Sequence, residues 1–391
     1  MKPVPTYPRT LDLPGLLKKK SHFLFGPRAT GKTTLIRQQL NGKAVLIDLL
    51  KGEYAMQLSA RPWDLEAIAS AVLTPTSWVV IDEVQKNPPL LDEVHRLIEE
   101  KGWRFLLTGS SARKFKRGHA NLLAGRAWKA ELFPLTWHEI GDFDLNRYLR
   151  YGGLPVVYAN SDDSKRNEEL HAYAQTYLRE EILAEGLIRK LPPFSRFLQS
   201  AALMNGQLIN YAQIASDSEV PAATIREYFS ILEDTLIGFQ LAPWTRSKKR
   251  KAIQTVKFYF FDTGVTHTLA GTKTLDRNSD LYGMSFEQFI GMEIRAYLSY
   301  SRAKRMMSFW RTTHGMEVDF LIDDEVGIEV KSTVRRSQRD GAGLRALEEE
   351  GKFKKLFLVT QDKIPMRQGH MTALHWEDFL KKLWDGDIVS G

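Results

Sequence analysis

The residues from Gly26 to Thr34 read GPRATGKTT, and their types and spacing suit the binding of phosphate groups. They match the pattern G-x-x-x-x-G-K-[ST], in which glycines let backbone N–H groups close around phosphate oxygens. We expect Lys32 to reach the β- and γ-phosphates of a nucleotide and Thr33 to ligate Mg²⁺. The whole stretch is assigned to nucleotide binding: Gly26, Pro27, Arg28, Ala29, Thr30, Gly31, Lys32, Thr33 and Thr34.

Two acidic residues follow the apolar run at residues 78–81 and suit nucleotide hydrolysis. That reaction needs one carboxylate for the Mg²⁺ shell and a second group that orients or deprotonates water. Side chains alternate along a strand, so Asp82 and Glu83 point to different sides, which suits two separate roles. We assign Asp82 to the metal and Glu83 to the water. A third apolar run, at residues 104–107, is followed by Thr108 and Ser110, one of which is expected to touch the γ-phosphate or the water. No N-K-x-D-like segment is visible, which favours ATP over GTP.

The elements around these motifs predict a parallel sheet covered by helices, here assigned to residues 1–135. An apolar strand at residues 22–25 precedes the loop, and a helix at 33–40 follows it, so that the phosphates would lie at a helix N-terminus. Helical patterns separate the strands, as in an α/β fold. Arg126 lies beyond the third strand and is a candidate arginine finger for a neighbouring subunit of a homo-oligomer, such as a hexameric ring. The alternative is an ordinary surface arginine.

Composition and charge narrow the class of protein. The chain has 391 residues, enough for two or three domains. It has no cysteine, no signal-like N-terminus and no apolar run near the ~18 residues of a membrane span, so we expect a cytoplasmic location without membrane association. The formal net charge is +8, and residues 240–261 contain no acidic residue. An anionic partner, DNA, is expected.

The middle of the chain is predicted to hold a helical lid at residues 136–190 and a winged helix at 191–265. Helices at 194–204, 211–216 and 221–235 precede apolar strands at 236–244 and 256–261. Thr224 and Arg226 would enter a major groove. The basic residues expected to contact phosphates at the tip of the wing are Arg246, Lys248, Lys249, Arg250 and Lys251. A winged helix that binds protein is the alternative.

A second group of chemically active residues lies in the hairpin sequence MEVDFLIDDEVGIEVKS, residues 316–332. A turn centred on Asp324 places Asp319 opposite Glu329, and two facing carboxylates destabilise a sheet unless a cation binds them. Oxygen ligands favour Mg²⁺ or Mn²⁺. Lys331 shares their face, and Glu287 is a further candidate ligand. The alternative is an edge hairpin with solvated charges.

This D…E-x-K arrangement resembles the PD-(D/E)xK nuclease superfamily over residues 282–360. The resemblance implies that Asp319 and Glu329 bind metal and that Lys331 assists a water molecule. Val318 stands where the superfamily name has proline. The predicted order of helix, three strands, helix and strand fits a nuclease-like α/β domain at residues 280–391.

The whole chain resembles a bacterial and archaeal family of AAA-type ATPases with a C-terminal domain of unknown function. The motifs GPRATGKTTL, VIDEVQKNP, LLTGSSAR, LAGRA, YGGLP, KFYFFDTG, FWRTTHGMEVDF and GIEVKS occur in that family's order. The resemblance implies an ATPase with Lys32, Asp82 and Glu83 as hydrolytic residues and Arg126 as a finger. We therefore expect an ATPase that remodels or translocates DNA, with a nuclease domain. The alternative is a nucleotide-controlled, protein-binding switch whose nuclease-like domain is inert.

Overall fold

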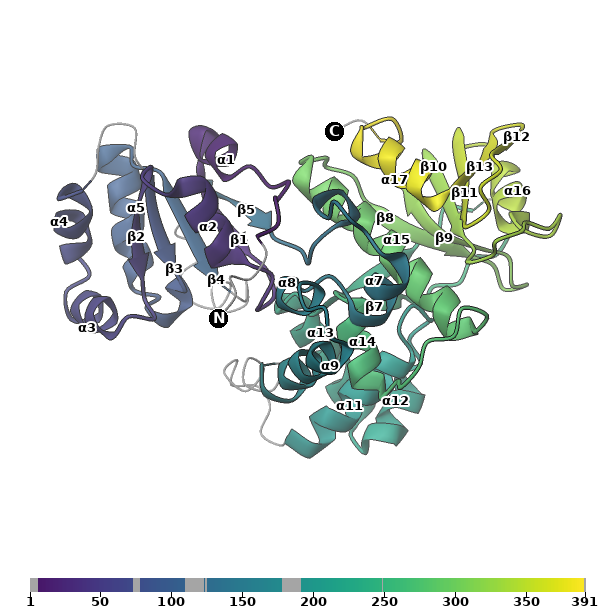
Figure 1. Ribbon diagram of the computed structural model, residues 1–391, viewed down its shortest axis with the longest axis horizontal. Coiled ribbons are helices and arrows are strands. Elements are labelled where there is room, and N and C mark those ends of the chain that lie inside the picture. The colour runs from purple at the N-terminus through teal and green to yellow at the C-terminus, as the bar shows by residue number, and fades with distance from the viewer. Residues whose placement is uncertain are drawn as a thin grey trace.

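Five parallel strands near the N-terminus form the sheet that the motif order predicts (Figure 1). The computed structural model describes residues 6–72, 78–109, 123, 125–177, 191–247 and 249–389. The strand order is β2-β3-β4-β1-β5. The bounds are β1 Ser21–Phe25, β2 Ala44–Asp48, β3 Trp78–Asp82, β4 Phe105–Gly109 and β5 Ala127–Glu131. Because β1, β4 and β3 are neighbours, the loops after them meet at one edge of the sheet.

Helices cover both faces of this sheet. On one face, α1 (Leu13–Lys19) and α2 (Lys32–Leu40) share a core with Leu24, Val80 and Leu106. On the other face, α4 (Asp64–Ser70) and α5 (Leu90–Lys101) share a core with Phe23, Ile81 and Leu107, as does α3 (Gly52–Ala60) through Leu58. Neighbouring residues of one strand thus enter opposite cores, as the two-residue period of a strand requires.

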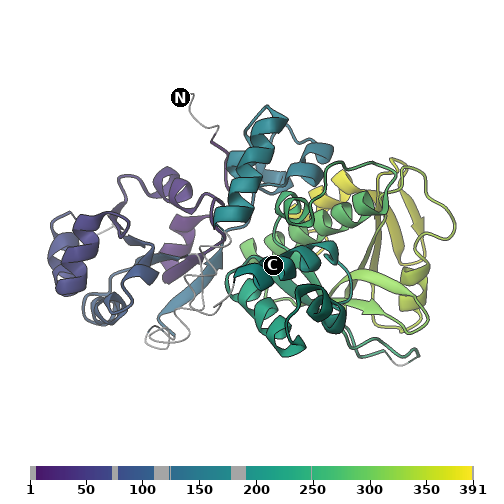
Figure 2. The same cartoon turned by 90° about the horizontal axis from the view of Figure 1, so that it is seen from below.

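A helical segment follows and lies between the first sheet and the C-terminal sheet (Figure 2). Most of its helices share one core, which includes Leu170, Phe197, Phe229 and Phe260, whereas Tyr148 and Leu149 of α7 pack into the core of the C-terminal segment. The boundary predicted at residue 190 therefore does not separate two cores in the described residues. The elements are η3 Trp137–Glu139, α7 Leu145–Tyr151, α8 Pro155–Tyr158, α9 Asp163–Ala172, η4 Tyr173–Tyr177, α11 Leu191–Leu203, α12 Tyr211–Ser218, α13 Ala222–Asp234 and α14 Thr263–Ala270.

The predicted ribbon of the wing is present, but it belongs to a larger sheet. β6 (Gly238–Pro243) pairs antiparallel with β7 (Lys257–Phe260). The end of β6 pairs in parallel with β8 (Met307–Arg311), Ala242 facing Ser308. The eight-stranded order is β12-β13-β11-β10-β9-β8-β6-β7. The ribbon is thus the edge of the C-terminal sheet.

The C-terminal segment has the predicted order of helix, three strands, helix and strand. It begins with α15 (Asp280–Tyr300), and α16 (Ala342–Glu348) follows the hairpin. Ile328 pairs with Phe320 and Val326 with Ile322, the register predicted from a turn centred on Asp324. The other elements are β9 Glu317–Ile322, β10 Val326–Val330, β11 Lys355–Thr360, β12 Met366–Gln368, β13 Met371–His375 and α17 Trp376–Trp384. No helix within the described ranges has the length and apolar character needed to cross a membrane.

Candidate nucleotide-hydrolysing site

The loop between β1 and α2 is a tight turn that ends at a helix N-terminus. Gly31, the residue before α2, has a φ of +93°, which residues with side chains rarely adopt. A Cβ at Gly26 would lie 2.6 Å from the carbonyl oxygen of Leu132. Lys32 is largely buried, and its Nζ donates to the carbonyl oxygens of Gly26 at 2.6 Å and Pro27 at 3.2 Å. The loop therefore combines backbone N–H groups, a helix N-terminus and an ammonium, which together suit phosphate.

Asp82 lies at the end of β3, beside the loop. The Thr33 hydroxyl donates to Asp82 Oδ2 at 2.9 Å, and the Thr108 hydroxyl donates to Asp82 Oδ1. A hydroxyl and a carboxylate in contact are the oxygen donors that hold Mg²⁺ in nucleotide hydrolases. The residues present fit this ion, with Thr33 and Asp82 as its protein ligands.

Glu83 leaves the strand through a turn of the backbone. Its φ is 60°, in the left-handed region, and its N–H donates to the Thr108 hydroxyl at 3.0 Å. One buried hydroxyl thus contacts both acidic residues, Asp82 directly and Glu83 through its backbone. These hydrogen bonds hold the two acids in place, and contact of Thr108 with the γ-phosphate or the water stays a prediction. Ser110, the other residue of that prediction, lies outside the described residues.

Arg9 joins this loop to the rest of the molecule, and sequence reasoning did not single it out. Its Nη1 donates to the Thr30 carbonyl oxygen at 2.7 Å, and its Nε donates to Glu139 Oε2 at 3.0 Å. Its Nη2 donates to the Phe133 carbonyl oxygen at 2.6 Å. The Phe133 N–H in turn donates to the hydroxyl of Tyr300, the last residue of α15, at 3.1 Å.

A small cavity of about 110 Å³ lies beside Gly31, the last glycine of the loop. It is lined by the N-terminal segment, by the first turns of α2 and by the start of α8. Its lining residues are Thr6, Tyr7, Arg9, Gly31, Thr34, Leu35, Gln38, Leu135 and Pro155. Pro155 belongs to the segment predicted to be a lid, so this segment lies beside the loop; its role as a lid stays a prediction.

Arg126 lies far from the loop of its own chain. Ser21, at the start of β1, pairs with Ala127, at the start of the parallel strand β5, whereas the loop follows the end of β1. Arg126 Nε contacts Glu99 Oε1 at 2.6 Å in a partly exposed ion pair. In this arrangement Arg126 lies at the opposite end of the sheet from the loop of its own chain.

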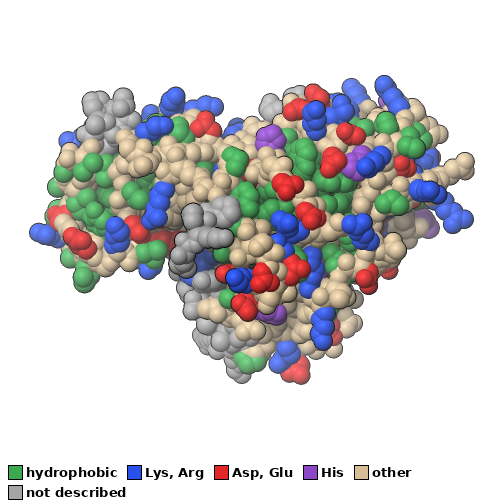
Figure 3. Space-filling model, in the orientation of Figure 1, with side chains coloured by type: hydrophobic (Ala, Val, Ile, Leu, Met, Phe, Trp, Pro, Cys, Tyr) green, Lys and Arg blue, Asp and Glu red, His purple; other side chains and the backbone are tan. Residues whose placement is uncertain are grey.

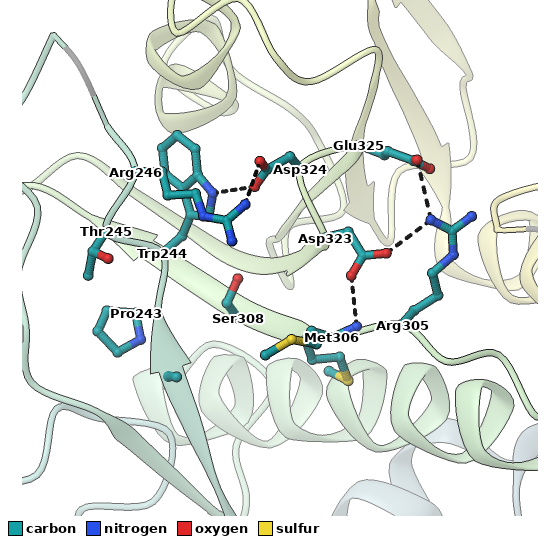
Figure 4. Close-up of a pocket in the computed structure, with 12 residues that line it drawn as sticks. Pro243, Trp244, Thr245, Arg246, Arg305, Met306, Ser308, Asp323, Asp324 and Glu325 are labelled. Carbon is teal, nitrogen blue, oxygen red and sulfur yellow. Dashed lines mark hydrogen bonds and ion pairs between the residues drawn. The ribbon is translucent and has the colours of Figure 1, made fainter.

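Two of the predicted DNA-binding residues, Arg246 and Arg250, form ion pairs with the C-terminal segment, although the Arg246 side chain is also exposed. Arg246 Nη1 contacts Asp324 Oδ2 at 3.0 Å, and Trp244 Nε1 donates to Asp324 Oδ1 at 2.7 Å (Figure 4). Arg250 Nη2 contacts Glu349 Oε2 at 2.7 Å. The basic run therefore packs against the C-terminal domain instead of projecting as the tip of a wing, because β6 continues into that sheet. Figure 4 shows Arg246 at a surface hollow of about 530 Å³.

The remaining predicted DNA-binding residues have no ion pair among the interactions described above, or they lie on another element. Lys249 and Lys251 are exposed, and Lys248 lies outside the described residues. On α13, Thr224 is half-buried, and the Arg226 guanidinium lies 4.1 Å from the centre of the Tyr211 ring. On the face drawn in Figure 3, Lys and Arg side chains are mixed with Asp and Glu.

The four residues predicted for the C-terminal site lie near one another: Asp319, Glu329 and Lys331 belong to the hairpin segment, and Glu287 belongs to α15. Burial raises the pKa of Asp319 well above its usual range; the Glu287 carboxylate raises it further, while Lys257 and Lys331 oppose this. Lys331 Nζ lies 3.3 Å from Glu329 Oε1. Burial also raises the pKa of Glu329, and the Lys331 ammonium opposes that rise.

Lys257, from β7, and Glu317, from β9, also belong to this cluster, and sequence reasoning missed both. Lys257 Nζ lies 2.6 Å from Glu317 Oε1 and 3.2 Å from Glu287 Oε1. In the part of the chain that the structure describes, no three His, Cys, Asp or Glu residues are arranged to hold a metal ion. The predicted Mg²⁺ or Mn²⁺ therefore does not fit this arrangement. A lysine alternating with the apolar residues Phe258 and Phe260 was the available signal in the sequence.

The parallel sheet, the phosphate-binding loop and the paired acids define a P-loop nucleotide-binding domain. Comparison with known families agrees, since residues 18–141 match an AAA domain. Residues 142–276 match a domain of unknown function (DUF8612), which spans both the predicted lid and the predicted winged helix. Residues 282–379 match another domain of unknown function (DUF4143).

Similar whole proteins come from bacteria and an archaeon. An uncharacterized protein of Mycobacterium tuberculosis is 29% identical over 331 residues, covering 81% of this chain and 72% of its own length. An uncharacterized protein of Methanocaldococcus jannaschii is 22% identical over 338 residues, covering 79% and 74%. The similarity thus extends from the AAA domain into the later segments.

Proposed function

We propose that this protein binds and hydrolyses ATP at the P-loop and uses the cycle to remodel or translocate DNA. The observation that carries the hydrolytic part is the network in which Thr33 and Thr108 both hold Asp82 while Thr108 also holds Glu83. Bound Mg²⁺ would neutralise charge on the β- and γ-phosphates. Thr33 and Asp82 would hold the ion, and Lys32 would bind the same phosphates.

Glu83 is the residue proposed to orient and deprotonate the attacking water. Its backbone leaves the strand in a left-handed conformation, so its carboxylate is directed differently from that of Asp82. Hydrogen bonding of its N–H to Thr108 fixes this direction. The cavity beside Gly31 and Thr34 is proposed to receive the nucleoside, with Tyr7 and Leu35 as apolar walls.

Completion of the site by a second chain is part of the proposal. Arg126 lies at the opposite end of β5 from the edge that carries the loop, so a homo-oligomer, for example a ring, would bring it to a neighbour's γ-phosphate. An arginine supplied in this way stabilises the charge of the transition state.

DNA is the proposed partner because of net charge and exposed basic residues. The formal charge is +8, and Lys249 and Lys251 are exposed on a segment without acidic residues. A protein that neutralises phosphates gains affinity by releasing counterions. The three helices followed by the β6–β7 ribbon have the order of elements of a winged helix, which supports this choice.

Measurement of ATP turnover tests both parts of the proposal. Lys32→Ala should weaken ATP binding, and Glu83→Gln should keep binding but lose at least ~10²-fold in turnover, the scale of a lost general base. Turnover of the wild type should rise with single-stranded, duplex or four-way-junction DNA. Equal hydrolysis by Glu83→Gln would refute the hydrolytic assignment. An ATP turnover rate that none of these DNAs changes would favour the protein-binding switch.

DNA cleavage by the C-terminal domain stays a prediction. The closeness of Asp319, Glu329 and Lys331 supports DNA cleavage. The described residues contain no group of three His, Cys, Asp or Glu residues arranged to hold a metal ion, and this argues against it. A nicking assay with Mn²⁺, comparing the wild type with Lys331→Ala, addresses it directly. Nicking that is lost in the variant would establish a nuclease.

A further inference from the structure

Lys257 inserts a buried ammonium into the carboxylate cluster of the C-terminal sheet. Only 3% of its side chain is exposed. Its two carboxylate contacts come from different elements, Glu287 on α15 and Glu317 on β9. The hydroxyl of Tyr259, two residues further along β7, donates to the same Glu287 oxygen at 2.5 Å. The side chain is therefore enclosed by the cluster and does not lie on its rim.

The other carboxylates of the cluster also have partners within the protein. Arg311 Nη1 lies 3.2 Å from Glu317 Oε2, and Lys331 Nζ lies 3.3 Å from Glu329 Oε1. Asp319 Oδ2 accepts a hydrogen bond of 2.7 Å from the Val330 N–H. Lys257, Arg311 and Lys331 thus neutralise the three glutamates of the cluster. The remaining acid, Asp319, accepts a hydrogen bond from the backbone.

Facing carboxylates in a sheet need a positive charge, and a metal ion is only one source of it. Mg²⁺ requires several oxygen ligands at about 2.0–2.1 Å, which an ammonium among the same carboxylates prevents. Lys257 supplies this positive charge as part of the chain, so the charge does not depend on the concentration of metal ions.

We infer that Lys257 is the resident cation of this cluster: its ammonium takes the place of the divalent ion among Glu287, Glu317 and Asp319. The C-terminal site is consequently closed to Mg²⁺ and Mn²⁺ while Lys257 is in place. Because Lys257 comes from β7, outside the segment that resembles nucleases, the preceding ribbon supplies the charge that closes the site.

Titration of nucleotide-free, full-length protein with Mn²⁺ tests this inference apart from the ATPase. The wild type should bind no Mn²⁺ at this cluster. Lys257→Ala should bind one Mn²⁺ per chain by calorimetry at pH 8. With free Mn²⁺ at about 100 times the dissociation constant, Tm should rise by roughly 3 °C. Adding Asp319→Asn to Lys257→Ala should abolish both effects, which locates the ion.

Two variants serve as controls. Lys331→Ala removes a half-exposed ammonium from the rim of the cluster and should not create the Mn²⁺ site. Lys257→Met keeps most of the apolar stem and replaces Lys257→Ala if the latter does not fold. Mn²⁺ binding by the wild type that Asp319→Asn removes would overturn the inference. So would a folded Lys257 variant that binds no Mn²⁺.

Discussion

Arg9 Nη1 donates a hydrogen bond of 2.7 Å to the carbonyl oxygen of Thr30, within the phosphate-binding loop. The same guanidinium contacts Glu139, and through the Phe133 backbone it is linked to Tyr300 at the end of α15. The loop that is expected to hold ATP is therefore connected by hydrogen bonds to the helix that carries Glu287. Only 4% of the Arg9 side chain and 1% of the Glu139 side chain are exposed.

Arg9→Ala is expected to lower the free energy of unfolding by about 3–5 kcal/mol, the scale for breaking a buried ion pair, because it leaves the Glu139 carboxylate without its cation. It should also weaken ATP binding, since Thr30 loses its support. Denaturant unfolding and nucleotide titration measure the two effects. In the double variant Arg9→Ala with Glu139→Gln, part of the stability should return. Additive losses would show that the ion pair is not the cause.

Thr108→Val is expected to reduce ATP turnover by roughly 10- to 100-fold. The change removes one hydrogen bond to the Asp82 carboxylate and leaves the Glu83 N–H without its acceptor, a loss of about 1.5–3 kcal/mol. Steady-state hydrolysis measures it. Thr108→Ser keeps the hydroxyl and should retain most of the activity. Equal rates for the Val variant and the wild type would remove Thr108 from the site.

Arg126→Ala should retain ATP binding and lose as much as ~10³-fold in turnover if the residue acts as a finger on a second chain. Glu99→Gln breaks the same ion pair without removing the arginine, and such an exposed pair contributes little to stability. It should therefore hydrolyse ATP normally. Mixing Arg126→Ala with Glu83→Gln should restore some activity. No recovery despite measured subunit exchange would argue against a finger in trans.

Replacing Lys249 and Lys251 together with alanine is expected to weaken DNA binding regardless of sequence. The slope of log affinity against log salt should flatten by about 0.9 for each DNA phosphate that the variant no longer neutralises. Arg246→Ala is the matched comparison, since Arg246 is paired with Asp324 and its removal should change the slope less. Binding isotherms at several salt concentrations provide the test. An unchanged slope in the double variant would place the DNA-binding surface elsewhere.

Glu293 predicts a pH dependence of stability. It is buried, and burial raises its pKa to about 8, although hydrogen bonds from the Trp137 N–H and Trp384 Nε1 oppose the rise. Between its ordinary value of 4.5 and about 8, the folded state holds a proton that the unfolded state has lost. The free energy of unfolding should therefore fall as pH rises through this window, by up to about 1.4 kcal/mol per pH unit relative to Glu293→Gln. Parallel pH curves for the two proteins would contradict this.

The nucleotide site was predictable from sequence because its chemistry is local. The turn that Gly26 and Gly31 permit, and the acids at the end of β3, depend on a few neighbouring residues. The same holds for the hairpin, where the two-residue period and the turn around Asp324 predict the pairing that the structure has. The predicted elements of the C-terminal segment follow from equally short patterns.

Contacts between distant segments were decided only by the tertiary structure. Arg9 and Glu139 are 130 residues apart, and Lys257 and Glu287 are 30 apart on different elements. The pairing of β6 with β8 likewise placed Arg246 and Arg250 against the C-terminal domain. Local propensity sets where a strand or helix forms, but the partner of a buried charge is selected by the packing of whole elements. The local sequence around Lys257 predicts only a short strand. The packing of that strand against α15 and β9 is what makes Lys257 the counter-charge of the carboxylate cluster.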